Sequence, residues 1–168
     1  MDIECGESER NVEKLVEAFA QVSAQHQDAE LVVVGDGPHL DALKALAKGH
    51  PVVFTGFLEG EALSKAYSGA DVFVFPSMTD TFGNVVLEAQ ASGLPAIVAD
   101  RGGPAEIVEH ERTGLVVDAS RAEMMANAMM RLMQNREECS RMAQDARCAA
   151  EANSWEAAAR RFIQHKEA

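Results

Sequence analysis

Five short runs of apolar residues, separated by segments whose apolar residues recur at helical spacing, constrain the fold of this chain most strongly. The runs lie at residues 31–34, 52–54, 72–75, 96–99 and 115–117. Continuous apolar strands that alternate with helices predict a parallel sheet covered on both faces. With Ile3-Glu4-Cys5 as the remnant of a further strand, we predict an α/β fold: a doubly wound parallel sheet of about six strands with C-terminal helices.

This fold class also predicts where a ligand binds. In doubly wound sheets, ligands bind beyond the carboxyl ends of the strands. Four loops of this chain follow the carboxyl end of a predicted strand, at residues 35–38, 55–58, 76–83 and 100–104. We therefore expect the functional site to lie among these loops.

The length and charge of the chain narrow the kind of ligand that it can bind. The chain has 168 residues, enough for one domain with a core. Its formal net charge of −12 argues against nucleic-acid binding, which usually needs a basic surface. A nucleotide ligand is not excluded, because backbone N–H groups at a helix start can hold phosphate.

The sequence also favours a cytoplasmic protein without a transmembrane segment. No apolar run approaches the roughly 18 residues of a membrane span, and residues 1–5 do not begin a signal peptide. The three cysteines, Cys5, Cys139 and Cys148, are odd in number and lack metal-type spacing. They favour plain thiols in a reducing compartment.

Residues 76–89 carry the most specific chemistry. This segment is expected to run from a strand, through a polar loop, into a helix that begins near Gly83. Free N–H groups of Gly83, Asn84 and Val85, with the positive end of the helix dipole, would form an anion site suited to a diphosphate. Asp80 precedes this site, and Glu88 lies about one turn inside the helix. Carboxylates accept hydrogen bonds from hydroxyl groups, so the pattern favours a sugar nucleotide.

Each acidic residue also has an ordinary structural interpretation. An acidic residue before a helix is often only a favourable charge at the helix start. A glutamate inside a helix is usually a solvated surface residue. The two carboxylates, their loop and the ligand rule for this fold together favour the functional interpretation.

Residues 80–99 read DTFGNVVLEAQASGLPAIVA and closely resemble the signature of the family 4 (group 1) retaining glycosyltransferases. Enzymes of this family have two Rossmann-like domains, the GT-B architecture. The resemblance implies that Glu88 binds the ribose of the donor nucleotide. It places Asp80, our candidate catalytic residue, against the donor sugar, where the family usually has a glutamate. Phe82 is a further candidate donor contact in this segment, beside Gly83, Asn84 and Val85.

Other segments resemble the same family. Residues 34–38, with Gly35 and Gly37, look like its glycine-rich second-strand turn, and Gly102-Gly103 looks like its loop near the sugar. The family also carries an arginine after its first strand and a lysine before the next helix. This chain has no arginine directly after Gly6, and Arg10 stands where the lysine is expected. Arg10 is therefore a candidate phosphate contact, with a solvated arginine at a helix start as an equal alternative.

The resemblance implies that residues 1–168 form a single C-terminal domain that binds a nucleotide sugar, without the N-terminal acceptor domain. The complete enzyme would transfer a sugar from this donor to an acceptor, with no metal or other cofactor. The fragment would bind nucleotide but turn over little or no sugar. The resemblance leaves peripheral membrane association of the full-length protein open. Two alternatives remain: a non-catalytic module that binds nucleotide sugars and, less favoured, half of a sugar-nucleotide epimerase.

Overall fold

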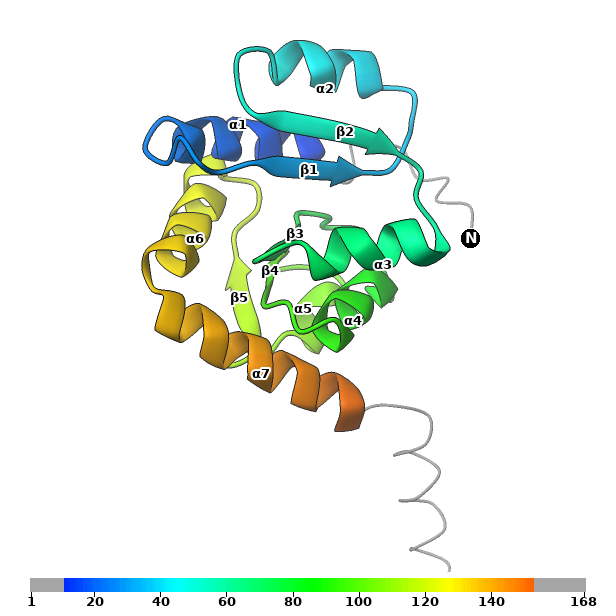
Figure 1. The fold of residues 1–168 in the computed structure, drawn as a ribbon, viewed down its shortest axis with the longest axis vertical. Helices are drawn as coiled ribbons and strands as arrows, with labels where there is room; N and C mark the ends of the chain where they lie inside the picture. Colours follow the sequence, from blue (N-terminus) through cyan, green and yellow to red (C-terminus); the bar gives the residue numbers. More distant parts are fainter. Residues whose placement is uncertain (1–10, 153–168) are drawn as a thin grey trace, which may run out of the picture.

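The computed structural model describes residues 11–152, which form an α/β fold (Figure 1). Its elements, in chain order, are α1 (Val12–Ser23), β1 (Leu31–Val34), α2 (Leu40–Leu46), β2 (Val52–Gly56), α3 (Gly60–Ser68), β3 (Phe73–Phe75), α4 (Asn84–Ala91), β4 (Ala96–Ala99), α5 (Pro104–Ile107), β5 (Gly114–Val117), α6 (Ala122–Gln134) and α7 (Arg136–Ala152). The predicted fold class and the five predicted strands at residues 31–117 are confirmed. The sixth strand, predicted at residues 3–5, lies outside the described residues.

Every strand pair in the described part of the chain is parallel. β1 pairs with β2, and β4 lies between β3 and β5. All four residues of β4 are buried, as its uninterrupted apolar sequence predicts. The same prediction is wrong for β1 among the described residues, because Val32 and Val34 of this equally apolar strand are exposed on one face. Between residues 11 and 152 the strands form a two-stranded and a three-stranded sheet, and no strand there joins β1 to β3. The fold class holds, but one continuous sheet is not seen among these residues.

One apolar core serves both sheets. Phe19 and Val22 of α1 and Met125 and Leu132 of α6 are buried in the same cluster as Ile97 of β4. Other side chains of the two sheets pack against this cluster at its edge: Leu31, Val52 and Val74. Burying each large apolar side chain contributes about 1.5–3 kcal/mol relative to leaving it exposed. The α1–α6 layer therefore holds the two sheets together.

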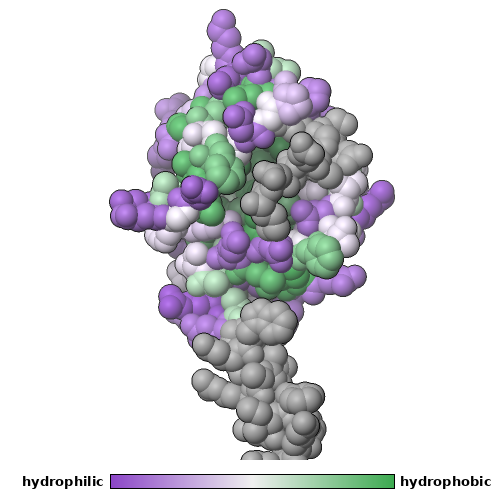
Figure 2. Space-filling model, turned by 90° about the vertical axis from the view of Figure 1, so that its right-hand side faces the viewer, coloured by the Kyte–Doolittle hydropathy of each residue, from purple (hydrophilic) through white to green (hydrophobic). Residues whose placement is uncertain are grey.

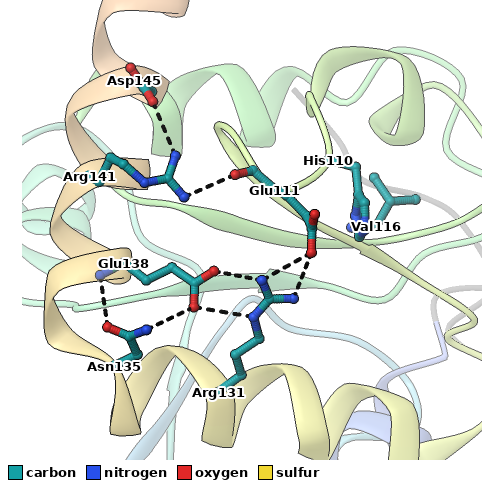
Figure 3. Close-up of polar contacts among 8 residues, drawn as sticks. All are labelled: His110, Glu111, Val116, Arg131, Asn135, Glu138, Arg141 and Asp145. Carbon is teal, nitrogen blue, oxygen red and sulfur yellow. Dashed lines mark hydrogen bonds and ion pairs between the residues drawn. The ribbon is translucent and has the colours of Figure 1, made fainter.

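A network of ion pairs fixes the junction between α6 and α7 (Figure 3). Arg131 donates hydrogen bonds to Glu111 at 3.0 Å and to Glu138 at 2.6 and 3.2 Å. Hydrogen bonding to Arg131 holds the pKa of Glu138 below its ordinary value. Arg141 donates to the carbonyl of Glu111, whose backbone is left-handed with φ 64°. Exposed ion pairs contribute little individually, so this network mainly orients α7 relative to the turn before β5.

The surface is mixed in character. On the face that Figure 2 shows, hydrophobic atoms gather in patches between hydrophilic side chains. The large apolar side chains that are exposed include Val32, Val34, Val53, Phe57 and Phe82. Between residues 11 and 152 no helix combines the length and the apolar character that crossing a membrane requires.

Candidate functional site

The loop at residues 76–83 leads from the carboxyl end of β3 into α4 (Figure 1). Gly83 precedes the helix in a left-handed conformation, with φ 61°. A Cβ atom at this position would lie 2.9 Å from Cδ1 of Ile107 and 3.2 Å from Cα of Pro104. Glycine is therefore required both by the backbone conformation and by the close approach of α5.

Asp80 organises this loop. Its Oδ1 atom accepts hydrogen bonds from the backbone N–H groups of Phe82, at 3.0 Å, and Gly83, at 2.7 Å. The expectation that the Gly83 N–H group is free is therefore wrong in this structure. The reason is local: an aspartate side chain is short enough to bond the backbone two and three residues ahead. Its second oxygen, Oδ2, has no hydrogen-bond partner among residues 11–152.

The start of α4 keeps two further backbone donors. The N–H groups of Asn84 and Val85 have no acceptor within the described part of the chain. The helix dipole places partial positive charge at this end. Of the three N–H groups predicted to hold an anion, those of Asn84 and Val85 are available at the start of α4, and that of Gly83 is bonded to Asp80.

The Gly102-Gly103 loop lies directly against the Asp80 loop. The N–H group of Gly103 donates to the carbonyl oxygen of Asp80 at 2.9 Å. A Cβ atom on Gly103 would lie 2.1 Å from the carbonyl oxygen of Thr81, and one on Gly102 would lie 2.7 Å from that of Asp80. Only residues without a side chain allow the two backbones to approach this closely. The structure therefore brings Asp80, Gly83, Gly102 and Gly103 together.

Glu88 is exposed on α4 and has one side-chain partner among residues 11–152. The hydroxyl of Tyr67, on α3, donates a hydrogen bond to Glu88 Oε2 at 3.2 Å. Burial raises the pKa of Tyr67 above its ordinary value of 10.0, and the negative charge and hydrogen bond of Glu88 raise it further. Tyr67 was not among the sequence-predicted site residues. In the sequence, Tyr67 stands beside other apolar residues of a short helix, which indicates only that its ring packs against the core. No pattern in the neighbouring residues connects Tyr67 with Glu88.

Comparison with known proteins identifies the family. Residues 6–148 match the family described as "Glycosyl transferases group 1". The chain belongs to this family.

Two curated relatives and one solved structure illustrate the similarity of this group 1 chain to known proteins. A sulfoquinovosyl transferase from Arabidopsis thaliana is 38% identical over 150 residues, covering 88% of this chain and 29% of the relative. A GDP-mannose-dependent alpha-mannosyltransferase from Mycolicibacterium smegmatis is 47% identical over 106 residues, covering 63% of this chain and 28% of the relative. The structure of sucrose-phosphate synthase from Thermosynechococcus elongatus has a TM-score of 0.80 and 31% identity, covering 95% of this chain and 42% of the other.

Family membership confirms the resemblance that we drew from residues 80–99. The comparisons do not favour the two alternatives, which were a non-catalytic module and half of a sugar-nucleotide epimerase. The group 1 chain spans less than a third of the length of these two curated relatives. Among residues 11–152 there is no group of three or more His, Cys, Asp or Glu side chains that could hold a metal ion.

The remaining predicted contacts of the group 1 chain lie at different places. Gly35 follows β1 with φ 133°, and its N–H group donates to the carbonyl of Gly56 at 2.9 Å. The Gly37 N–H group donates to the side chain of Asp36 at 2.8 Å. Phe82 is 76% exposed, so its ring is not part of the core. Arg10 lies outside the described residues.

Proposed function

We propose that this domain binds the nucleoside diphosphate part of a nucleotide sugar, and that the complete protein transfers the sugar to an acceptor with retention at the anomeric carbon. The observation that carries the proposal is the start of α4. Two backbone N–H groups without an acceptor among residues 11–152 lie there, with Asp80 on one side and the exposed Glu88 on the other. That a similar mannosyltransferase is named as GDP-mannose-dependent supports a donor of this class.

Each part of the site has a separate task. Negative charge develops on the diphosphate as the glycosidic bond to the sugar breaks. The N–H groups of Asn84 and Val85 and the α4 dipole are placed to stabilise this charge. Glu88 accepts hydrogen bonds from the ribose hydroxyls. Asp80 uses Oδ1 to hold its loop, so Oδ2 is the oxygen that contacts the donor sugar.

The other sequence-predicted contacts complete this assignment. Gly102 and Gly103 support the sugar end of the site through their backbone contact with Asp80. Gly35 and Gly37 shape the turn after β1, and Phe82 offers an exposed ring beside the diphosphate. Arg10 supplies a positive charge to the phosphates. No metal or other cofactor takes part in this scheme.

We further propose that residues 1–168 are the C-terminal donor domain of a larger cytoplasmic enzyme whose acceptor site lies in an N-terminal domain. The difference in length between this chain and its curated relatives supports this division. On this basis the chain alone binds nucleotide but transfers little or no sugar.

Calorimetric titration of this chain with UDP, GDP and ADP tests the proposal. We expect one of the three to bind, and Glu88→Ala to weaken its binding by about 1–3 kcal/mol, the cost of losing a charged hydrogen-bond partner. Glu30→Ala is the matched control. Glu30 is exposed and directly precedes β1, at the amino end of its sheet, opposite to the ligand edge.

The two variants give a clear contrast. Equal weakening by Glu88→Ala and Glu30→Ala would contradict the ribose role of Glu88. Absence of binding by the unmodified chain at millimolar nucleotide would contradict a donor site carried by this domain alone.

A further inference from the structure

Glu88 is held by a second helix. Tyr67 lies near the end of α3, which Figure 1 draws next to α4. Its hydroxyl lies 3.2 Å from Glu88 Oε2 and 3.5 Å from the carbonyl oxygen of Val85. The phenol can donate only one proton, and the shorter contact is to the charged acceptor, which favours the bond to Glu88.

The ring of Tyr67 is fixed independently of this hydrogen bond. It packs against the ring of Phe73 on β3, with centroids 5.8 Å apart and planes inclined by 56°. Phe73 in turn stacks on Phe75 at 6.1 Å. A half-buried ring that packs against Phe73 places its hydroxyl at a defined point next to α4. Tyr67 can therefore fix Glu88, which would otherwise be a freely rotating side chain on an exposed helix face.

We propose that Tyr67 is a positioning residue of the donor site: by holding Oε2 of Glu88, it directs Oε1 toward the ribose hydroxyls of a nucleotide. The inference rests on the proposed function. A carboxylate has lone pairs on both oxygens, and Oε1 has no hydrogen-bond partner among residues 11–152. An oriented acceptor binds a pair of adjacent hydroxyls better than a mobile one, because less rotational freedom is lost on binding.

The state of the phenol suits this role. Burial and the adjacent carboxylate both raise the pKa of Tyr67, so the hydroxyl keeps its proton as pH rises above 10.0, the ordinary pKa of tyrosine. Tyr67 is therefore a constant donor throughout the neutral range.

Tyr67→Phe tests the inference because it removes only the hydroxyl and keeps the ring on Phe73. The nucleoside diphosphate that binds the unmodified chain is titrated into both proteins, beside its 2′,3′-dideoxy analogue. We expect Tyr67→Phe to weaken binding of the ribonucleotide about threefold to tenfold, the range that one hydrogen bond contributes. Binding of the dideoxy analogue should stay within about twofold, because that analogue lacks the hydroxyls that Glu88 would accept.

Two further variants separate positioning from a structural contribution. In a Glu88→Ala background, Tyr67→Phe should have no additional effect on nucleotide affinity. Ser68→Ala removes a hydroxyl from the next residue of α3, which bonds only the carbonyl of Ser64, and should leave both affinities unchanged. Equal weakening of ribonucleotide and dideoxy analogue by Tyr67→Phe would show a structural role and overturn the inference.

The contact itself can be tested without a ligand. Tyr67 is the only tyrosine of the chain, so ultraviolet difference absorbance reports its ionisation alone. We expect phenolate formation in the folded chain only above the ordinary pKa, and at a lower pH in Glu88→Ala than in the unmodified protein. Identical titration of the two proteins would overturn the inference while leaving the proposed function intact. If the titration shifts as expected but no nucleotide binds, the proposed function fails and the positioning role fails with it.

Discussion

At the scale of single residues, Asp80 shows how a one-methylene difference changes the task of a side chain. Family 4 enzymes usually carry a glutamate at this place. The shorter aspartate reaches the N–H groups of Phe82 and Gly83 and closes the loop before α4. One carboxylate oxygen therefore holds the loop. The resemblance to the family assigns Asp80 to the donor sugar, and only the structure shows that its side chain also organises its own loop.

This division of roles leads to a stability prediction for Asp80. We expect Asp80→Ala to lower the free energy of unfolding by about 1–3 kcal/mol, because the N–H groups of Phe82 and Gly83 lose their hydrogen-bond acceptor. Asp80→Asn keeps a carbonyl oxygen in the same place and should change stability by less than about 0.5 kcal/mol. Urea unfolding of the three proteins measures the difference. An equal loss in both variants would mean that charge, and not loop hydrogen bonding, stabilises this turn.

At the scale of elements, two loops that are distant in sequence form one unit at the carboxyl ends of β3 and β4. The loop after β4 passes so close to residues 80 and 81 that no side chain fits at Gly103. Gly103 itself has ordinary helical backbone angles, φ −57° and ψ −36°. Space, rather than backbone conformation, therefore requires glycine here. This contact keeps the Asp80 loop in place against α5.

Gly103→Ala tests this requirement. The added methyl group would lie 2.1 Å from the Thr81 carbonyl oxygen, so the loops must move apart. We expect a loss of at least about 1–3 kcal/mol in the free energy of unfolding, as for other overpacked sites. Gly69→Ala is the matched control, because Gly69 also has right-handed angles and its Cβ would meet only Lys65 O at 3.3 Å. Thermal unfolding should show a large drop for the first variant and little change for the second; similar behaviour of the two would refute the close contact.

At the scale of the whole molecule, the described residues form two sheets over one core. Ile97 of the β3–β4–β5 sheet belongs to the apolar cluster around α1 and α6. Packed against this cluster are Leu31 and Val52 of the β1–β2 sheet and Val74 of the β3–β4–β5 sheet. A shared core couples the stability of both sheets, even though no hydrogen-bonded strand pair joins them between residues 11 and 152. The four loops that we predict to surround the ligand follow strands of both sheets. The position of these loops relative to one another therefore depends on the α1–α6 layer.

Met125 is the side chain with which to test this coupling. It is 1% exposed, and we expect Met125→Ala to lower the free energy of unfolding by about 2–5 kcal/mol. Hydrogen exchange should show the amides of β2 and β4 losing protection together, because both sheets depend on the same core. Met124→Ala, on the same helix but only partly buried, should cost much less. Loss of protection confined to one sheet would show that the two unfold separately.

Much of the fold follows from local patterns in the sequence. Apolar runs located the strands, but β4 is the described strand that is buried along its whole length because it lies between β3 and β5, whereas the equally apolar β1 is exposed on one face. The short helix α5 begins at Pro104, because proline suits the first position of a helix. How the strands divide into sheets does not follow from the apolar runs: among residues 11–152 they form two sheets and not one.

By itself, the sequence determined the fold class, the loops at the carboxyl ends of the strands, and the positions of Asp80 before and Glu88 inside the same helix. These depend on periodicity and on residues near one another in the chain. Only the tertiary structure decided which backbone donors remain free at α4, that Gly103 touches Thr81, and that Tyr67 reaches Glu88. The physical reason is that these contacts depend on how separate elements pack, and the distance between α3 and α4 or between two loops is not encoded in the pattern of either segment alone.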